Sequence, residues 1–168
     1  MSEVKVENEQ YLTFVLDNET YAFDVLKTKE VLNLVKITPI PRTPSFMAGV
    51  INLRGSVVPV INLREKFSMK PNERTIDTSV IIVEVLYGKE VITIGALVDA
   101  VKAVVRFDES QKEPPPKIGM QLNVNLIHSI AKSNTNFVMI LNADNVFSEK
   151  ELSIITAHIP SDDIESVG

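Results

Sequence analysis

The sequence predicts an all-β (mainly β) fold of two small packed barrels with short helices. Three observations carry this prediction: apolar residues recur mostly at every second position, polar turn segments separate the apolar runs at short intervals, and helical patterns are few and short. The strands fall into two groups of similar size on either side of a polar segment near residue 70. Two small barrels fit a chain of 168 residues better than one large barrel.

The first half of the chain contains two predicted hairpins. Their β-rich runs are residues 11–16 with 21–26, and residues 49–53 with 57–63. The first pair turns through the polar segment 17–20, and the second through Arg54-Gly55-Ser56, where glycine supplies the turn. Pro59 interrupts the last run, so its nitrogen should face a sheet edge or a bulge.

The second half continues the β pattern. A third hairpin pairs residues 79–86 with 91–98 through the turn 87–90, and further β-rich segments are 103–107 and 137–141. We expect a flexible N-terminus over 1–10, a first barrel over 11–70, a second barrel over 71–147 and a C-terminal helix or tail over 148–168. These boundaries are approximate and allow the two barrels to intertwine.

Helical signals are limited to three places. Residues 27–34 are a candidate for barely two turns, and residues 44–47 for a single turn that begins at Pro44. Ser148 is a plausible N-cap for a C-terminal helix, because Glu149 and Glu151 follow in the first turn, where the helix dipole favours acids.

The composition argues against several classes of function. The chain has no cysteine, which removes disulfide frameworks, thiolate metal sites and cysteine nucleophiles. Its formal charge of −5 provides no global positive field, so we expect neither nucleic-acid binding nor direct membrane contact. The chain opens without a secretory signal pattern and has no apolar stretch long enough to span a bilayer, which predicts a cytoplasmic protein.

The sequence also lacks a catalytic constellation. Phosphate-binding glycine loops, the HExxH zinc pattern and the serine nucleophile elbow are all absent. His128 and His158 are two isolated histidines, a poor basis for a metal site. We therefore expect no enzyme activity, no cofactor and no metal, with a glycosidase-like carboxylate pair left open as an alternative because counting acids does not single out two of them.

A series of short motifs follows in a fixed order along the chain. It comprises residues 21–25 (YAFDV), 29–31 (KEV), 37–41 (ITPIP), 49–55 (GVINLRG), 58–64 (VPVINLR), 94–101 (IGALVDAV) and 113–116 (EPPP). In this order and spacing the series resembles the CheW family of chemotaxis coupling proteins over about residues 11–147. Three positions depart from the family pattern: Asn62 and Asn142 stand where aspartate is usual, and Ser129 stands where glycine is usual.

The resemblance implies a non-catalytic adaptor made of two five-stranded SH3-like barrels. It also implies two partners, the signalling tip of a chemoreceptor (a methyl-accepting chemotaxis protein) and the regulatory domain of the histidine kinase CheA. The receptor tip, a helical hairpin, would lie in the groove between the barrels, and the protein would reach membrane-bound receptor arrays through these partners. The alternative is a CheW-like regulatory or coupling domain of another two-component protein, such as a CheV-like protein or a kinase.

For the receptor side, the resemblance implies five residues. Glu30 and Arg54 match family positions that form an ion pair, and Thr28, Val31 and Val98 are further receptor-binding candidates. The alternative is that Arg54 is an ordinary turn arginine and Glu30 a solvated acid, while Val31 and Val98 simply belong to the core.

For the kinase side, we select Ile37 and Gly49. Ile37 opens the proline-rich loop, and Gly49 could allow close backbone approach where any side chain would clash. The alternative for Gly49 is a purely conformational glycine.

Overall fold

The structure, a computed structural model, describes residues 9–33, 35–115 and 126–157. Most of these residues lie in strands: β1 (Gln10–Leu16), β2 (Glu19–Asp24), β3 (Thr28–Asn33), β4 (Met47–Leu53), β5 (Ser56–Asn62), β6 (Ser79–Tyr87), β7 (Glu90–Val98), β8 (Ala100–Arg106), β9 (Lys112–Glu113), β10 (Ile127–Ser133) and β11 (Asn136–Leu141). The helices are short: α1 (Leu63–Lys66), α2 (Glu149–Ala157) and the 3-10 turns η1 (Val25–Lys27), η2 (Glu109–Gln111) and η4 (Ala143–Asn145). None of the helices described is long and apolar enough to cross a membrane.

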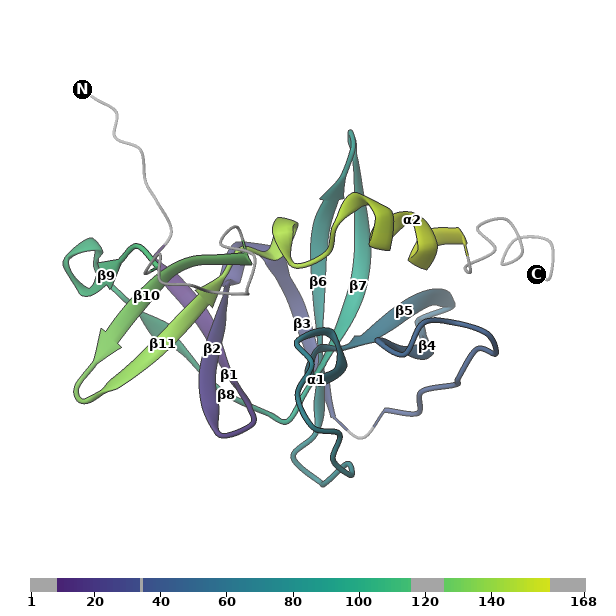
Figure 1. The fold of residues 1–168 in the computed structure, drawn as a ribbon, viewed down its shortest axis with the longest axis horizontal. Coiled ribbons are helices and arrows are strands. Elements are labelled where there is room, and N and C mark those ends of the chain that lie inside the picture. The colour runs from purple at the N-terminus through teal and green to yellow at the C-terminus, as the bar shows by residue number, and fades with distance from the viewer. Residues whose placement is uncertain (1–8, 34, 116–125, 158–168) are drawn as a thin grey trace.

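The strands form two sheets, which confirms the prediction of a mainly β fold in two packed parts. The first sheet has the order β8-β1-β2-β11-β10-β9 and the second the order β3-β6-β7-β5-β4. Figure 1 shows the six-stranded sheet on the left and the five-stranded sheet on the right, with α2 running above β5 and β4. The first sheet exceeds the expected five strands because the two-residue β9 adds to its edge through β10.

The sheets are not divided at residue 70, where the sequence analysis placed the boundary between barrels. The six-stranded sheet combines the β1–β2 hairpin with strands that follow Asp99, whereas β3 to β7 build the five-stranded sheet. The chain therefore crosses between the sheets at η1, after β2, and again at Asp99, between β7 and β8. The barrels intertwine because the N-terminal hairpin pairs with β8 and β11, far along the chain.

All three predicted hairpins are present and turn on two residues each. Asp17 and Asn18 have φ values of 53° and 69°, and Arg54 and Gly55 have values of 51° and 91°. Two successive positive φ values are the signature of the tight turn whose twist matches that of the flanking strands. Gly88, with φ 65°, begins the third turn.

Pro59 lies in the interior strand β5, opposite Val50 of β4. Both backbone polar groups of Val50 bond to Thr38, so this cross-strand pair exchanges no hydrogen bonds and the nitrogen of Pro59 points away from β4. On that other side the ladder to β7 begins only at Val60. The missing N–H therefore costs no ladder bond, although Pro59 lies in an interior strand and not at the sheet edge that the sequence analysis offered as one possibility.

The helix expected over residues 27–34 is wrong, because the segment forms strand β3 from Thr28 to Asn33. The neighbouring side chains Val31 and Leu32 pack into two different apolar clusters. This alternation between opposite faces is the period of a strand, and antiparallel pairing with β6 fixes it. The single turn expected at residues 44–47 is present: the N–H of Met47 bonds to the carbonyl of Pro44 at 3.0 Å, directly before β4, and the turn does not extend into a helix.

The helix expected after Ser148 is confirmed as α2. The Ser148 hydroxyl accepts from the Glu151 N–H at 3.1 Å, and the Glu151 carboxylate accepts from the Ser148 N–H at 2.9 Å. This reciprocal pair is a capping box, which satisfies two of the N–H groups that a helix start leaves free. Residues 1–8 of the expected N-terminal segment 1–10 and residues 158–168 of the expected segment 148–168 lie outside the described residues.

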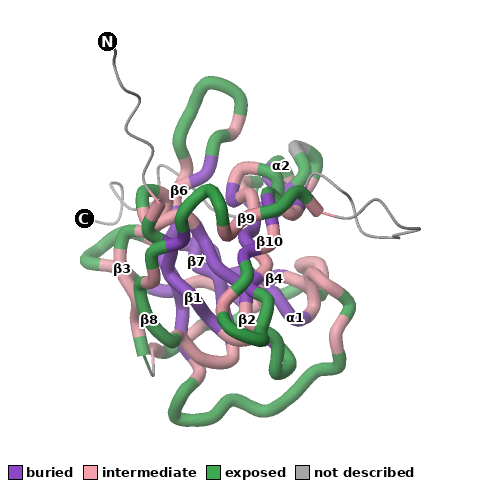
Figure 2. Tube along the Cα trace, turned by 90° about the vertical axis from the view of Figure 1, so that its left-hand side faces the viewer, coloured by how far each residue is buried: buried purple, intermediate pink, exposed green. Residues whose placement is uncertain are grey.

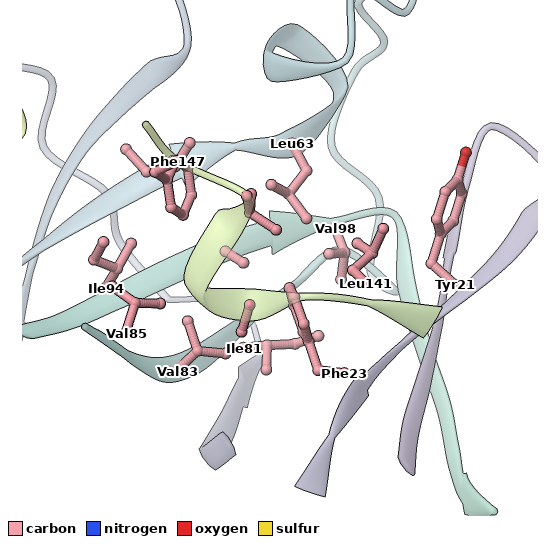
Figure 3. Packing of buried hydrophobic residues seen from close by; sticks show 14 of the residues in the cluster. Tyr21, Phe23, Leu63, Ile81, Val83, Val85, Ile94, Val98, Leu141 and Phe147 are labelled. Carbon is pink, nitrogen blue, oxygen red and sulfur yellow. The ribbon is translucent and has the colours of Figure 1, made fainter. Parts of the chain in front are cut away.

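A single main core joins the two sheets and α2. It contains Phe14 and Phe23 from the first sheet, Ile81 and Ile94 from the second, and Ile155 from α2, each at most 2% exposed. Figure 3 shows this packing, with Phe23, Ile81, Val83, Ile94 and Phe147 converging from different elements. Figure 2 shows buried residues gathered along β1, β2 and β7, with exposed residues on the surrounding loops. The two barrels therefore bury apolar surface against each other, and each sheet also holds a smaller buried cluster of its own.

Candidate functional site

Glu30 and Arg54 form an ion pair on the five-stranded sheet. Glu30 lies on β3 and Arg54 in the turn between β4 and β5, where the side-chain oxygen of Asn52 accepts from the Gly55 N–H at 2.8 Å and holds the turn. Because β3 and β4 are the two edges of this sheet, the pair bridges the gap that the strand ladders leave open. The Arg54 side chain is 70% exposed and that of Glu30 is 29% exposed, so solvent weakens the attraction between the two charges.

A groove of about 630 Å³, here called the ion-pair groove, opens beside these two residues. The five strands of the second sheet and Thr156 of α2 line it. Its walls include Lys29, Glu30, Leu53, Arg54, Val57 and Ile92. Apolar side chains with charges beside them are what an amphipathic helix needs from its binding surface.

The other receptor candidates differ in accessibility. Thr28 begins β3, is partly exposed and donates its hydroxyl to the carbonyl of Val25 at 2.9 Å. Val31 is partly buried and packs against the main core. Val98 is 1% exposed. Figure 3 shows its side chain inside the main core, which agrees with the alternative that Val98 is a core residue. A contact of Val98 with a receptor stays a prediction.

Gly49 lies where no other residue fits. Its φ is 147°, and a Cβ atom there would be 2.3 Å from the carbonyl oxygen of Thr38. This close approach lets the N–H of Val50 donate to Thr38 at 2.9 Å and the N–H of Thr38 donate back at 2.8 Å. The resulting bridge connects β4, one edge of the five-stranded sheet, to the segment that follows β3, the other edge. The close approach of the Thr38 backbone thus explains why a glycine is needed at position 49. A contact of Gly49 with the kinase stays a prediction.

Ile37 lies directly beside Gly49, with its Cγ2 atom 3.0 Å from where a Cβ of residue 49 would be. It is partly buried and lines a small apolar cleft of about 220 Å³. Val35, Thr75, Thr78, Val80 and Leu97 are among the other lining residues of this Ile37 cleft. The sequence analysis missed them because the loop before β6 and the end of β7 meet only in the folded sheet.

Asn62 and Ser129, two of the positions that depart from the family pattern, keep the local structure intact. The amide oxygen of Asn62 accepts from the Arg64 N–H at 3.0 Å and caps α1, as a carboxylate oxygen would. Ser129 is buried at a bulge in β10, and its hydroxyl lies 3.1 Å from Nδ1 of His128. Asn142 precedes η4 and makes no side-chain cap there.

A lysine-centred cluster on the six-stranded sheet offers no nucleophile. Lys112 lies 2.8 Å from the Tyr11 hydroxyl and 3.1 Å from Glu109. Burial alone lowers the pKa of Lys112, but its bonds to Tyr11 and Glu109 outweigh that effect and raise the pKa above its ordinary value. The amine is therefore held as an ammonium ion.

The described residues contain no group of three or more histidine, cysteine or acidic side chains that could hold a metal ion. His128 is exposed on β10, and His158 lies outside the described residues.

Comparison with known proteins gives one consistent result. A family profile described as the CheW-like domain matches residues 10–151. "Chemotaxis protein CheW" of Bacillus subtilis is 31% identical over 150 residues, covering 89% of this chain and 92% of that protein. The protein of the same name from Treponema pallidum is 28% identical over 154 residues, covering 89% and 88%. The crystal structure of scaffolding protein TtCheW from Thermoanaerobacter tengcongensis superposes with a TM-score of 0.76 at 35% identity, covering 86% of this chain and 97% of that chain.

Proposed function

The chain belongs to the family of CheW-like domains and is a chemotaxis scaffold protein, and from that premise we propose that it is a non-catalytic, cytoplasmic adaptor that couples chemoreceptor tips to the histidine kinase CheA. The observation that carries this proposal is the Glu30–Arg54 ion pair beside the ion-pair groove. The groove supplies apolar surface for a helix, and the charged pair supplies a polar edge to orient it.

The two proposed contacts lie at different places on the five-stranded sheet. The receptor would contact the surface around Thr28, Glu30 and Arg54, and the kinase regulatory domain would contact the Ile37 cleft. Gly49 is buried, so its part in the kinase contact would be to hold Ile37 in position. An adaptor needs such separate surfaces, because it must hold both partners at once.

The test is reconstitution from purified components. The chain is mixed with a chemoreceptor signalling fragment and CheA, complex formation is followed by size-exclusion chromatography, and kinase autophosphorylation is measured with and without receptor. We expect a ternary complex and receptor-dependent control of autophosphorylation only when the chain is present. Failure of the chain to bind either partner would overturn the proposal.

Matched variants separate the two surfaces. Arg54→Ala should weaken the receptor complex, whereas Arg106→Ala should not, although Arg106 is 68% exposed and also ion-paired. Ile37→Ser should weaken CheA binding and spare the receptor complex, whereas Val91→Ser, at an exposed position of the same sheet, should spare both. Equal effects of a variant and its control would contradict the assignment of that surface.

A further inference from the structure

Arg64 is a buried charge at the junction of the two sheets. Its side chain is 9% exposed and it lies on α1, directly after β5. Its Nη1 donates to Oδ2 of Asp99 at 2.7 Å and its Nε donates to the carbonyl oxygen of Lys70 at 2.8 Å. Its Nη2 lies 3.5 Å from Oδ1 of Asp17. The planar guanidinium thus contacts three different segments of the chain.

These partners belong to both sheets. Asp99 is the single residue between β7 of the five-stranded sheet and β8 of the six-stranded sheet. Asp17 lies in the turn between β1 and β2 of the six-stranded sheet, and its N–H donates to the same Oδ2 of Asp99 at 2.8 Å. The N–H of Asp99 in turn donates to the carbonyl of Val15 on β1 at 3.1 Å.

This cluster, here called the Arg64 junction, differs physically from the core that also joins the sheets. Apolar burial is non-directional, so the main core favours contact between the sheets without fixing one angle. Charge-assisted hydrogen bonds to a planar guanidinium are directional. A change of angle between the sheets would separate Arg64 from Asp17 or Asp99 and leave a buried charge without its partner.

We propose that Arg64 is a positioning residue that fixes the orientation of the two sheets relative to each other and thereby sets where the six-stranded sheet lies relative to the receptor surface around Glu30 and Arg54. The functional part of this inference rests on the proposed function with one addition, that a receptor tip seated at Glu30 and Arg54 also reaches the six-stranded sheet, while the kinase contacts the Ile37 cleft of the five-stranded sheet alone. Loss of the Arg64 junction then weakens receptor binding selectively and leaves the kinase surface intact.

The orientation can be measured without any partner. The chain has no cysteine, so cysteines placed at the exposed positions Lys89 and Asn136 give one spin label on each sheet without background labelling. Pulsed electron paramagnetic resonance then gives the distribution of distances between the labels. We expect a broader or shifted distribution in Arg64→Lys and Arg64→Met than in the parent, because neither side chain reproduces the guanidinium fork.

Two further variants keep the test decisive. Asp17→Ala removes the ion-pair partner that is 56% exposed, so this variant should fold even if Arg64→Met fails to fold. It should broaden the distance distribution less than the Arg64 variants do. Arg106→Met is the control, since the ion-pair partners of Arg106 among the residues that the structure describes are Glu9 and Asp108, which flank strands of the six-stranded sheet. A merely stabilising role of Arg64 would lower the melting temperature without changing the distribution below it. An unchanged distribution in folded Arg64→Lys and Asp17→Ala would overturn the proposal.

Binding measurements complete the test. We expect the affinity of Arg64→Lys for the receptor fragment to fall about tenfold, within the usual range of coupling between sites, and its affinity for the CheA regulatory domain to stay within about twofold. Equal loss of both affinities would contradict a positioning role. If the parent chain binds neither partner, the proposed function fails, whereas the label distances still decide the role of Arg64.

Discussion

Replacing Gly49 with alanine tests whether this glycine serves the fold or a partner. The substitution places a Cβ atom 2.3 Å from the oxygen and 2.7 Å from the carbon of the Thr38 carbonyl group. Both are backbone atoms, so no rotamer change relieves the clash. The backbone must move, and the bridge between Thr38 and Val50 is the contact that opens first.

The expected cost follows from these contacts. A side chain in this positive-φ conformation costs about 1–3 kcal/mol, and overpacking of a fixed site costs about 1–3 kcal/mol more. Each backbone hydrogen bond lost with the bridge adds about 1 kcal/mol. We therefore expect Gly49→Ala to lower the free energy of unfolding by about 4–8 kcal/mol, which for a chain of this length lowers the melting temperature by roughly 10–30 °C.

Urea denaturation followed by far-ultraviolet circular dichroism measures this cost in a chain without tryptophan. Gly88→Ala is the matched control, because Gly88 also has a positive φ, 65°, but nothing lies within 4 Å of its added Cβ. It should lose only about 1–2 kcal/mol. If Gly49→Ala is as stable as Gly88→Ala yet loses CheA binding, the conformational reasoning is refuted and Gly49 is a contact residue.

Four further predictions follow from the geometry. Arg54→Ala should change the free energy of unfolding by no more than about 1 kcal/mol, because the ion pair is solvent-screened, and a loss of several kcal/mol in urea denaturation would contradict this. Ser148→Ala should cost about 1 kcal/mol through loss of the helix cap, measured as a melting temperature about 2–4 °C lower, whereas Ser153→Ala on the exposed side of the same helix should not. Burial first, then Glu19 and Asp17, raises the pKa of Tyr21, and the pKa of Lys112 is raised as well, so the unfolded chain releases these protons before the folded chain does. Stability should therefore be complete below pH 10 and fall above it, and Tyr21→Phe should flatten that fall in pH-dependent denaturation. Because one core joins both sheets, unfolding should be a single transition by circular dichroism and by tyrosine fluorescence, and separate midpoints would show that the sheets unfold independently.

The hairpins were predictable because their signals are local. An asparagine or glycine in a two-residue turn, flanked by apolar alternation, specifies a hairpin almost independently of the rest of the chain. The same holds for Ser148, whose capping partner Glu151 lies three residues away. The family motifs likewise led to Glu30 and Arg54, whose side chains meet in the structure.

Long-range choices were not predictable in the same way. The segment of β3 contains charged residues at spacings that suit a short helix, and only pairing with β6 makes it a strand. The barrel boundary was placed at residue 70 because a polar segment there separates two groups of predicted strands of similar size. In the structure β1 pairs with β8 and β2 pairs with β11, and no local sequence pattern predicts these pairings.

The positions that the motifs single out share a physical task. Glu30 with Arg54 connects β3 to the turn after β4, and Gly49 lets β4 bond to the segment after β3 through the Thr38–Val50 bridge. Arg64 connects the five-stranded sheet to the other through Asp99 and Asp17. Hairpins and apolar faces form from local sequence, but the closure of a sheet and the docking of two sheets need particular side chains at particular distances. A scaffold that works by holding partners in a fixed arrangement depends on these connections more than on its strands, because the connections set where its binding surfaces lie relative to one another.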